Sequence, residues 1–181
     1  MDVSPRPDRT SALHRAEALI ATIRDYPEPG IVFRDLTPLF ADAEALHDVI
    51  DALIAPFAGT FDAVAGIEAR GFVLAGAASR AAGVGLVPIR KAGRLPRERV
   101  SADYALEYGA ATIEAHRGDL PEGSRVLLLD DVLATGGTLR AAHEIGTALC
   151  WDVVGTAVVL EIEGLGGRDT VGADLHAVFA A

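Results

Sequence analysis

The chain has 181 residues, of which 50% are hydrophobic and 23% charged, a balance that is normal for one compact domain. A net charge of −10 argues against a protein that binds along a nucleic-acid backbone, because such proteins usually carry a basic face. The longest apolar run, Val153 to Leu160, is far shorter than the roughly 20 residues of a membrane span, so we expect no membrane association.

The first ten residues are polar and contain prolines, without the apolar segment that a secretory signal needs. We expect residues 1–10 to be mobile and residues 1–181 to form a single domain. The only cysteine, Cys150, cannot form an internal disulfide, which fits a reducing, cytoplasmic location. Its place at the expected end of a helix predicts a buried structural thiol.

The hydrophobic pattern predicts the secondary structure in chain order. Apolar residues at helical spacing predict helices over residues 11–24 and 44–54. Short apolar strands then alternate with helices, with strands at 63–67, 86–90, 125–130 and 153–162 and helices at 71–82 and 137–150. This alternation predicts an α/β fold with a mostly parallel sheet and helices on both faces. Residues 91–123 break the pattern, and so long a polar excursion predicts a functional flap.

The most informative stretch runs from Val126 to Thr138 and reads VLLLDDVLATGGT. An apolar strand that ends in Asp130 and Asp131 places two carboxylates at the carboxyl edge of the sheet, where open α/β folds bind ligands. A turn that can bind a phosphate follows, with glycines that let N–H groups converge, threonine hydroxyls and a helix N-terminus: Ala134, Thr135, Gly136, Gly137 and Thr138. The alternative is an ordinary capped helix, but adjacent aspartates repel each other unless cations or sugar hydroxyls lie nearby. The stretch favours a sugar phosphate as ligand.

Charged residues also follow two neighbouring predicted strands. One strand-to-helix turn contains Glu68, Ala69, Arg70 and Gly71 and can receive an anion, although an ordinary helix start with an acid is the alternative. Arg90 and Lys91 close the next strand and begin a segment with five cations and one acid up to Arg99. Such a concentration of positive charge focuses small anions, so the two strand ends together predict a diphosphate site.

Five segments in the same order resemble the adenine phosphoribosyltransferase family of type I phosphoribosyltransferases. They are PGIVFRDLTPL at 29–39, GIEARGF at 66–72, PIRKAGRLP at 88–96, YALEYG at 104–109 and the Asp-Asp stretch. The resemblance implies the type I phosphoribosyltransferase fold, with a base-binding hood and a flexible loop. It also implies Mg²⁺-dependent transfer of the 5-phosphoribosyl group from phosphoribosyl pyrophosphate (PRPP) to N9 of adenine, giving AMP and pyrophosphate, by a homodimer.

The resemblance further implies where the base and the pyrophosphate bind. Adenine would lie against Val32, Phe33 and Arg34, with Ile162 as a hydrophobic contact. Pyrophosphate would face a set of residues on two strand ends, namely Glu68, Ala69, Arg70, Gly71, Arg90 and Lys91. The Glu68–Ala69 peptide would be strained and able to adopt the cis form.

By the same resemblance, Asp130 and Asp131 would act in catalysis by binding the ribose hydroxyls, while residues 134–138 would bind the phosphate and ribose of PRPP or AMP. The flexible loop would contain Tyr104, Glu107 and Tyr108, with Glu107 as the general acid and base near N7 of adenine. PRPP and pyrophosphate would hold Mg²⁺ mainly by themselves. The five histidines show no close metal-ligand spacing, so no protein metal site is expected.

Two alternatives stay open from the sequence alone. One is a phosphoribosyltransferase for another purine or for orotate, and Phe33-Arg34 with Glu107-Tyr108 favours adenine instead. The other is a regulator that uses the same fold to sense PRPP or a nucleotide, but the pI of about 4.8 and the lack of a DNA-binding element argue against it. The acidic Glu163 departs from the family pattern beside Ile162.

Overall fold

The computed structural model describes residues 8–105, 110–172 and 174–181. The chain divides into two compact units, one up to Ala52 and the other from Leu53 onward. Among the described residues, no helix has both the length and the apolar character needed to cross a membrane.

The N-terminal unit combines helices with one antiparallel hairpin. Its elements are α1 (Arg9–Glu17), β1 (Ala21–Arg24), β2 (Val32–Asp35), α2 (Thr37–Ala41) and α3 (Ala43–Ile54), the last of which continues into the second unit. In the hairpin, Ala21 pairs with Asp35 and Arg24 with Val32. The start of α3 is stabilised by Asp42, whose Oδ1 accepts a hydrogen bond of 2.9 Å from the amide of Ala45.

The single helix predicted over residues 11–24 is wrong in its second half. The helix ends at Glu17, and residues 21–24 form β1 because their backbone groups pair with β2. Ile20 and Ile23 are three residues apart, which is helical spacing, but Ile20 precedes β1 and the pairing with β2 overrides this local pattern. The helix predicted over 44–54 is confirmed with one added residue.

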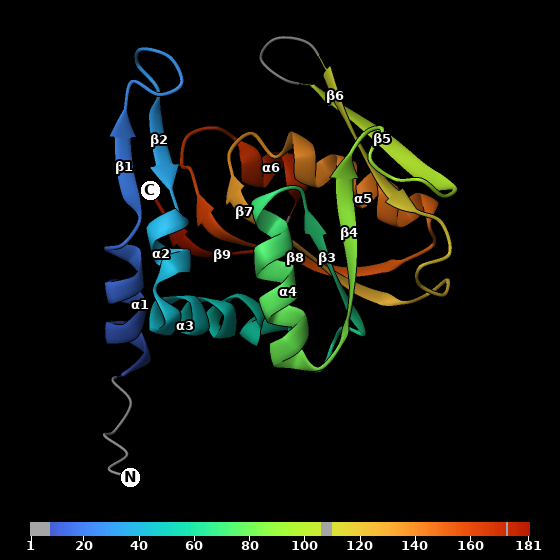
Figure 1. Ribbon diagram of the computed structural model, residues 1–181, viewed down its shortest axis with the longest axis horizontal. Coiled ribbons are helices and arrows are strands. Elements are labelled where there is room, and N and C mark those ends of the chain that lie inside the picture. The colour runs from blue at the N-terminus through green and yellow to red at the C-terminus, as the bar shows by residue number, and fades with distance from the viewer. Residues whose placement is uncertain (1–7, 106–109, 173) are drawn as a thin grey trace. The chain divides into compact units, whose positions relative to one another are not determined.

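The C-terminal unit contains a seven-stranded sheet in the order β5-β6-β4-β3-β7-β8-β9 (Figure 1). After the 3-10 turn η1 (Ala55–Phe57), its elements are β3 (Ala63–Ile67), α4 (Arg70–Ala82), β4 (Gly85–Lys91), β5 (Arg99–Ala105), β6 (Ala110–His116), β7 (Arg125–Leu133), α5 (Gly137–Ala148), β8 (Asp152–Glu161), α6 (Gly167–Val171) and β9 (Leu175–Ala180). The five strands from β4 to β9 in this order are parallel, whereas β5 and β6 are antiparallel. The predicted α/β fold with a mostly parallel sheet is confirmed.

Helices α4 and α5 cover opposite faces of this sheet, on the near and far sides in Figure 1. A Cβ atom placed on Gly66 of β3 would lie 2.6 Å from the Cβ of Ala75, so this face of the strand touches α4. The neighbouring Ile67, which points the other way, belongs to a buried cluster with Leu139 and Ile145 of α5. The alternation of side chains along β3 therefore separates the two helical layers.

Residues 91–123 do not form the irregular flap that the sequence predicted. They contain β5 and β6, which pair along their described length from Arg99 opposite His116 to Ala105 opposite Ala110. In these strands the backbone N–H and C=O groups bond to each other, whereas in an extended loop they would bond to water. A strand of this kind accommodates polar side chains on its outer face. Cys150 is also exposed instead of buried, since it turns with a φ of 56° between α5 and β8.

Candidate active site

Asp130 and Asp131 lie inside β7, which continues to Leu133, so the prediction that the strand ends at Asp130 is wrong by three residues. On one side β7 pairs with β3 only as far as Leu129, opposite Gly66. On the other side the pairing with β8 continues to Leu133, opposite Glu161, and this longer partner extends the strand. The two aspartates therefore lie just beyond the last pair between β3 and β7, at the carboxyl edge of the central strands.

The two carboxyl groups are held close together in a buried position. Asp130 is 9% exposed and Asp131 8% exposed, and the amide of Asp131 donates a 2.9 Å hydrogen bond to Oδ1 of Asp130. Burial, and then the adjacent charge of Asp131, raise the pKa of Asp130 well above its ordinary value. The pair thus combines one carboxyl group that resists ionisation with a second carboxylate beside it.

Arg70, at the first position of α4, faces Asp131. Its Nε lies 2.9 Å from Oδ2 of Asp131, close enough for an ion pair. The N–H is not aligned with this oxygen, and Oδ2, although buried, accepts no hydrogen bond from the part of the chain that the structure describes. A buried carboxylate oxygen with this unused capacity can accept a hydroxyl donor from a ligand.

Glu68 connects the end of β3 to the end of β4. Its Oε2 accepts a 2.9 Å hydrogen bond from the amide of Lys91 and lies 3.4 Å from Nε of Arg90. The amide of Lys91 contributes most to lowering the pKa of Glu68, and the charges of Arg90 and Arg94 also lower it, against an opposing effect of burial. The Glu68–Ala69 peptide is cis. The structure thus brings Glu68, Arg90 and Lys91 together, as the strand order predicts.

Gly71 is required for the close approach of α4 to β7. A Cβ atom at this position would lie 2.9 Å from the carbonyl oxygen of Leu129 and 3.2 Å from Oδ1 of Asp130. The first of these neighbours is backbone and cannot turn away. The absence of a side chain at Gly71 therefore lets the start of α4, with Arg70, reach the aspartates.

The predicted phosphate turn at residues 134–138 leads directly into α5. Gly136 has a φ of 82°, a left-handed conformation that favours glycine, and α5 begins at Gly137. The first amides of a helix have no acceptor within the helix, so those of Gly137 and Thr138 suit an anion. Helix α6 packs against this turn, because a Cβ atom on Gly136 would lie 2.6 Å from the carbonyl oxygen of Gly167.

The residues predicted to bind the base divide between the two units. Val32, Phe33 and Arg34 lie on β2, where the Phe33 ring meets Tyr26 edge-on at 5.3 Å and Nη1 of Arg34 donates a 2.6 Å hydrogen bond to Oγ1 of Thr22. Val32 is 49% exposed. Ile162 follows β8 in the C-terminal unit, and its amide donates to the carbonyl of Leu133 at 2.8 Å.

Glu107 and Tyr108, which were predicted to belong to the flexible loop, lie outside the described residues. Tyr104 lies on β5 opposite Ala111 and packs, half-buried, against the core. Its placement in an irregular segment is therefore wrong, because the cross-strand partner orders it.

Sequence reasoning missed Glu114 on β6, whose side chain is 1% exposed. Its Oε1 accepts hydrogen bonds of 3.0 Å from the amides of both Arg94 and Leu95, and its Oε2 lies 2.8 Å from Nε of Arg99. Burial alone would raise the pKa of Glu114, but the amide hydrogen bonds and the charge of Arg99 outweigh it and lower the pKa. No local signal could have found it, because Glu114 alternates with Ile113 and Ala115 as a solvent-facing acid of a strand would.

The described residues contain no group of three or more acidic, histidine or cysteine side chains that could hold a metal ion. Asp130 and Asp131 offer carboxylate oxygens, the donor type that Mg²⁺ accepts, and Oδ2 of Asp131 has unused capacity. The site thus fits a magnesium ion that takes most of its ligands from a phosphorylated substrate.

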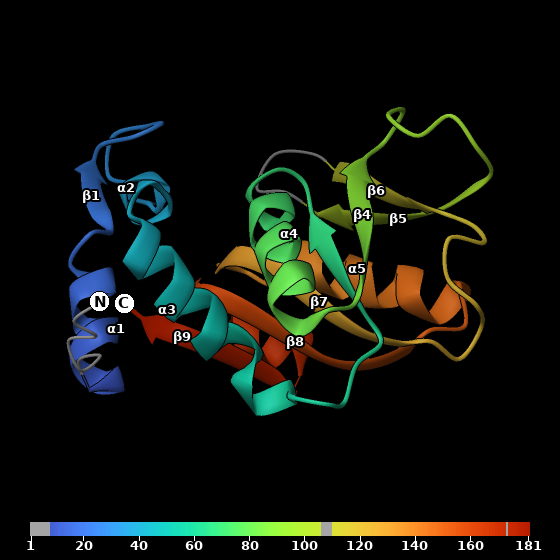
Figure 2. The same ribbon diagram turned by 60° about the horizontal axis from the view of Figure 1, so that its bottom comes forward.

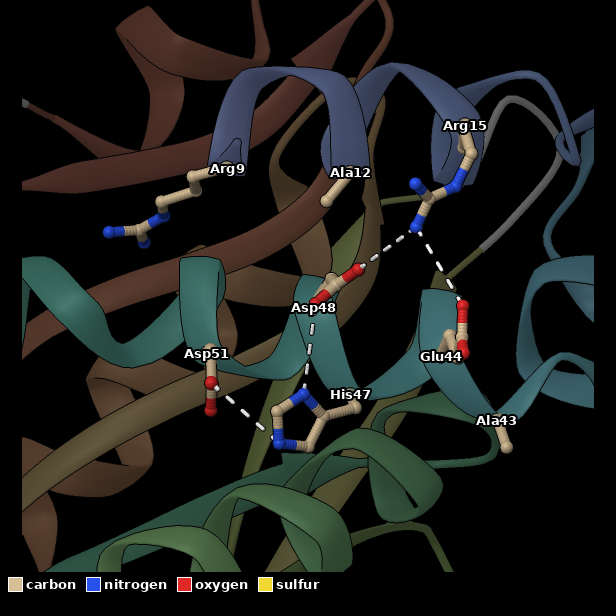
Figure 3. Close-up of a pocket in the computed structure, with 8 residues that line it drawn as sticks. All are labelled: Arg9, Ala12, Arg15, Ala43, Glu44, His47, Asp48 and Asp51. Carbon is tan, nitrogen blue, oxygen red and sulfur yellow. Dashed lines mark ion pairs between the residues drawn. The ribbon is translucent and has the colours of Figure 1, made fainter. Parts of the chain in front are cut away.

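A groove of about 730 Å³ lies between α1 and α3 in the N-terminal unit (Figure 3). Arg15 lies between two acids there, with Nη2 at 3.8 Å from Glu44 and 3.9 Å from Asp48. The residues that line this groove are Arg9, Ala12, Arg15, Ala43, Glu44, His47, Asp48 and Asp51. None of them belongs to the predicted site.

Comparisons with known proteins agree on one family. Residues 40–170 match the model of the phosphoribosyl transferase domain. The chain is 55% identical over 171 residues to the adenine phosphoribosyltransferase of Renibacterium salmoninarum, covering 94% of each chain. The crystal structure of adenine phosphoribosyltransferase from Rhodothermus marinus is similar with a TM-score of 0.89 and 41% identity, covering 95% of this chain and 99% of that one.

A second similar structure contains ligands. It is adenine phosphoribosyltransferase from Saccharomyces cerevisiae, complexed with adenine and an imino-altritol bisphosphate. Its TM-score to this chain is 0.87 at 34% identity, with 92% of this chain and 97% of that chain covered.

Proposed function

This chain belongs to the adenine phosphoribosyltransferase family, and we propose on that basis that it transfers the 5-phosphoribosyl group of PRPP to N9 of adenine. The products are AMP and pyrophosphate, which makes the reaction a step of purine salvage. The observation that carries the proposal is the buried Asp130–Asp131 pair beside Arg70, followed by the turn at 134–138. The two units would act together as one phosphoribosyltransferase domain.

The ribose phosphate would bind along β7 and the start of α5. The amides and hydroxyls of residues 134–138 would hold the phosphate at the helix N-terminus. The carboxylates of Asp130 and Asp131 would accept hydrogen bonds from the ribose 2- and 3-hydroxyls. Positive charge develops on the ribose ring as its bond to pyrophosphate breaks, and negative side chains held in place beforehand stabilise that charge.

The pyrophosphate would lie at the ends of β3 and β4, where Glu68, Arg90 and Lys91 meet. The guanidinium groups of Arg70 and Arg90 and the ammonium group of Lys91 would stabilise the charge on this leaving group, while Glu68, Ala69 and Gly71 shape the turn that receives it. Mg²⁺ bound mainly by PRPP oxygens would supply further charge neutralisation.

Adenine would bind against Val32, Phe33 and Arg34, with Ile162 as a further hydrophobic contact. The exposure of Val32 and the edge-on support of the Phe33 ring by Tyr26 suit a flat apolar ligand. The yeast relative, whose structure holds adenine, supports adenine as the base in place of another purine or orotate. Glu107 would manage the proton near N7 while N9 attacks C1 of the ribose.

We also propose that the enzyme works as a homodimer in the cytoplasm, without nucleic-acid or membrane partners. Membership in the family supports the dimer. The net charge of −10 supports the absence of a nucleic-acid partner.

An assay of base specificity tests the function. The purified protein is mixed with Mg²⁺ and PRPP and, separately, with adenine, hypoxanthine, guanine and orotate, and nucleotide and pyrophosphate are followed by chromatography. We expect AMP from adenine alone. Product from another base would overturn the adenine pocket but keep the mechanism, whereas PRPP binding without product from any base would favour a regulator.

A further inference from the structure

Glu114 is a buried acid outside the set of residues assigned above to substrate. It faces the connection between β4 and β5, which leaves the sheet beside β6 (Figure 2). Three consecutive residues of that connection direct their amides toward it, and those of Arg94 and Leu95 donate hydrogen bonds of 3.0 Å to the same oxygen. Gly93 has a φ of 79°, so the chain turns sharply at this point.

The turn held by Glu114 leads back to the predicted pyrophosphate residues through two contacts. The carbonyl oxygen of Arg94 accepts a 3.3 Å hydrogen bond from Nη1 of Arg90. Nε of the same guanidinium lies 3.4 Å from Oε2 of Glu68. In the sheet, Arg90 pairs directly with Glu114. The orientation of Arg90 thus depends on a backbone turn whose position Glu114 determines.

A purely structural residue at this position would not need a charge. A buried carboxylate must be compensated by hydrogen bonds and counter-charges, and an apolar side chain of similar size is often as stable. Glu114 makes both kinds of contact, with two amides on one oxygen and Arg99 on the other. The charge-assisted hydrogen bonds hold the turn, and with it the Arg94 carbonyl to which Arg90 donates.

We propose that Glu114 is a positioning residue for the diphosphate: it holds the turn at Gly93–Leu95, and through the Arg94 carbonyl it orients Arg90 toward PRPP and pyrophosphate. This inference rests on the proposed function. Glu114 itself touches no substrate. Its loss should therefore weaken the binding of ligands that contain a diphosphate and spare AMP, whose single phosphate is assigned to residues 134–138.

The test compares Glu114→Ala with the unmodified protein, using calorimetric binding of pyrophosphate with Mg²⁺ and, separately, of AMP. We expect the Kd of pyrophosphate to rise at least about tenfold, which corresponds to about 1.4 kcal/mol. The Kd of AMP should change less than about twofold, and the KM of PRPP should rise while that of adenine stays unchanged. Equal weakening of AMP and pyrophosphate would indicate general damage and overturn the proposal.

Arg99→Met is the comparison variant, because it keeps the amide hydrogen bonds to Glu114 while it removes the ion pair with the same carboxylate and the 3.3 Å hydrogen bond from Nη1 of Arg99 to the carbonyl of Leu95. We expect it to retain pyrophosphate binding within about threefold, since the two amide hydrogen bonds that hold the turn stay in place. If it weakens pyrophosphate binding as much as Glu114→Ala does, the amide hydrogen bonds to Glu114 are not what positions Arg90, and the proposal is wrong.

If Glu114→Ala does not fold, as judged by circular dichroism, Glu114→Gln decides the question. A neutral amide oxygen accepts hydrogen bonds more weakly than a carboxylate, so we expect a rise of about threefold in the Kd of pyrophosphate. An unchanged Kd in this variant would contradict the proposal. Failure of the unmodified protein to form AMP would instead refute the proposed function, so the two failures are distinguishable.

Discussion

Asp130 and Asp131 occupy adjacent positions in a strand that is otherwise apolar. Both are buried, and the raised pKa of Asp130 shows that the folded protein disfavours the second negative charge. Neutral side chains at these positions would relieve the repulsion but remove the negative charge that the proposed mechanism uses. Stability and catalysis therefore make opposite demands on these two residues.

Asp131→Asn tests the catalytic demand. We expect kcat for AMP formation to fall by about 100-fold or more, since loss of one preorganised electrostatic group typically costs 10² to 10³ in rate. The measurement is steady-state AMP formation at saturating adenine and PRPP. Asp62→Asn is the control, because Asp62 pairs with Arg125 at the other end of β7. A fully active Asp131→Asn variant would refute the assigned role.

Asp130→Asn tests the cost in stability. Because the pKa of Asp130 is raised in the folded state, the unfolded chain loses this proton first as the pH rises above about 3.8. The protonated Asp130 side chain costs no stability below that pH. As the pH rises toward the pKa of the folded state, ionisation favours the unfolded chain and the free energy of unfolding falls. Near pH 7 the variant should unfold at a higher temperature, by about 2–4 °C for each kcal/mol relieved. Thermal unfolding at several pH values measures this, and a gain that persists near pH 4 would assign the effect to packing.

Helix α4 is the element that brings Arg70 to Asp131, and it contains two glycines in different surroundings. Gly71 faces the Leu129 carbonyl, whereas a Cβ atom on Gly76 would meet nothing within 4 Å. The helix can therefore tolerate a methyl group at one position and not at the other.

Gly71→Ala should displace the start of α4, raise the KM of PRPP several-fold and lower the unfolding temperature, because the methyl group would collide with backbone. Gly76→Ala should keep full activity and stabilise the protein by about 0.5–1 kcal/mol, since alanine favours helix over glycine. Kinetics and thermal unfolding of both variants provide the measurement. Equal behaviour of the two would show that the contact at Gly71 does not restrict the helix.

The sequence predicted four of the five parallel strands because each contains a short apolar run, but it missed β9, whose short apolar run is interrupted by His176. It failed at β5, where Val100, Ala102 and Tyr104 alternate with polar residues but directly follow the cation-rich segment from Arg90 to Arg99. The high density of charged residues predicts a loop here, but β5 is an edge strand, and an edge strand needs apolar side chains on only one face. The position of Glu114 depends on the pairing of β6 with β4, which no local pattern contains.

The part of the candidate site around Asp130, Asp131, Glu68 and Arg90 could be predicted because these residues lie at or near the carboxyl ends of parallel strands, which meet at one edge of the sheet. The contact of Arg70 with Asp131 could not be predicted, since it depends on how closely Gly71 lets α4 approach β7. The exposure of Cys150 was also missed, because a helical stripe of apolar residues does not reveal where the chain turns away from the core.

For the molecule as a whole, charge is distributed unevenly. The chain has a net charge of −10, yet Arg70, Arg90 and Lys91 gather at one edge of the sheet, beside the exposed Arg94. Salt weakens the attraction between these cations and a charged ligand, and it affects the binding of an uncharged ligand much less.

We expect the KM of PRPP to rise about threefold or more as NaCl increases from about 0.05 to about 0.5 M, because the Debye length shortens to a few ångströms. The KM of adenine, a neutral base, should stay nearly constant. Initial rates at fixed free Mg²⁺ measure both values. A parallel rise in the two constants would show that salt acts on folding or assembly, not on the cationic edge.

The exposed Cys150 gives the protein a natural chemical handle. It is the only cysteine, and it follows α5, which begins beside the carboxyl edge of the sheet and runs to the opposite edge. A maleimide dye or a biotin linker should therefore attach at one known position remote from the Asp130–Asp131 pair, with AMP formation unchanged. The natural sequence, without any substitution, could then be attached to a surface through Cys150 so that the Asp130–Asp131 pair faces the solution.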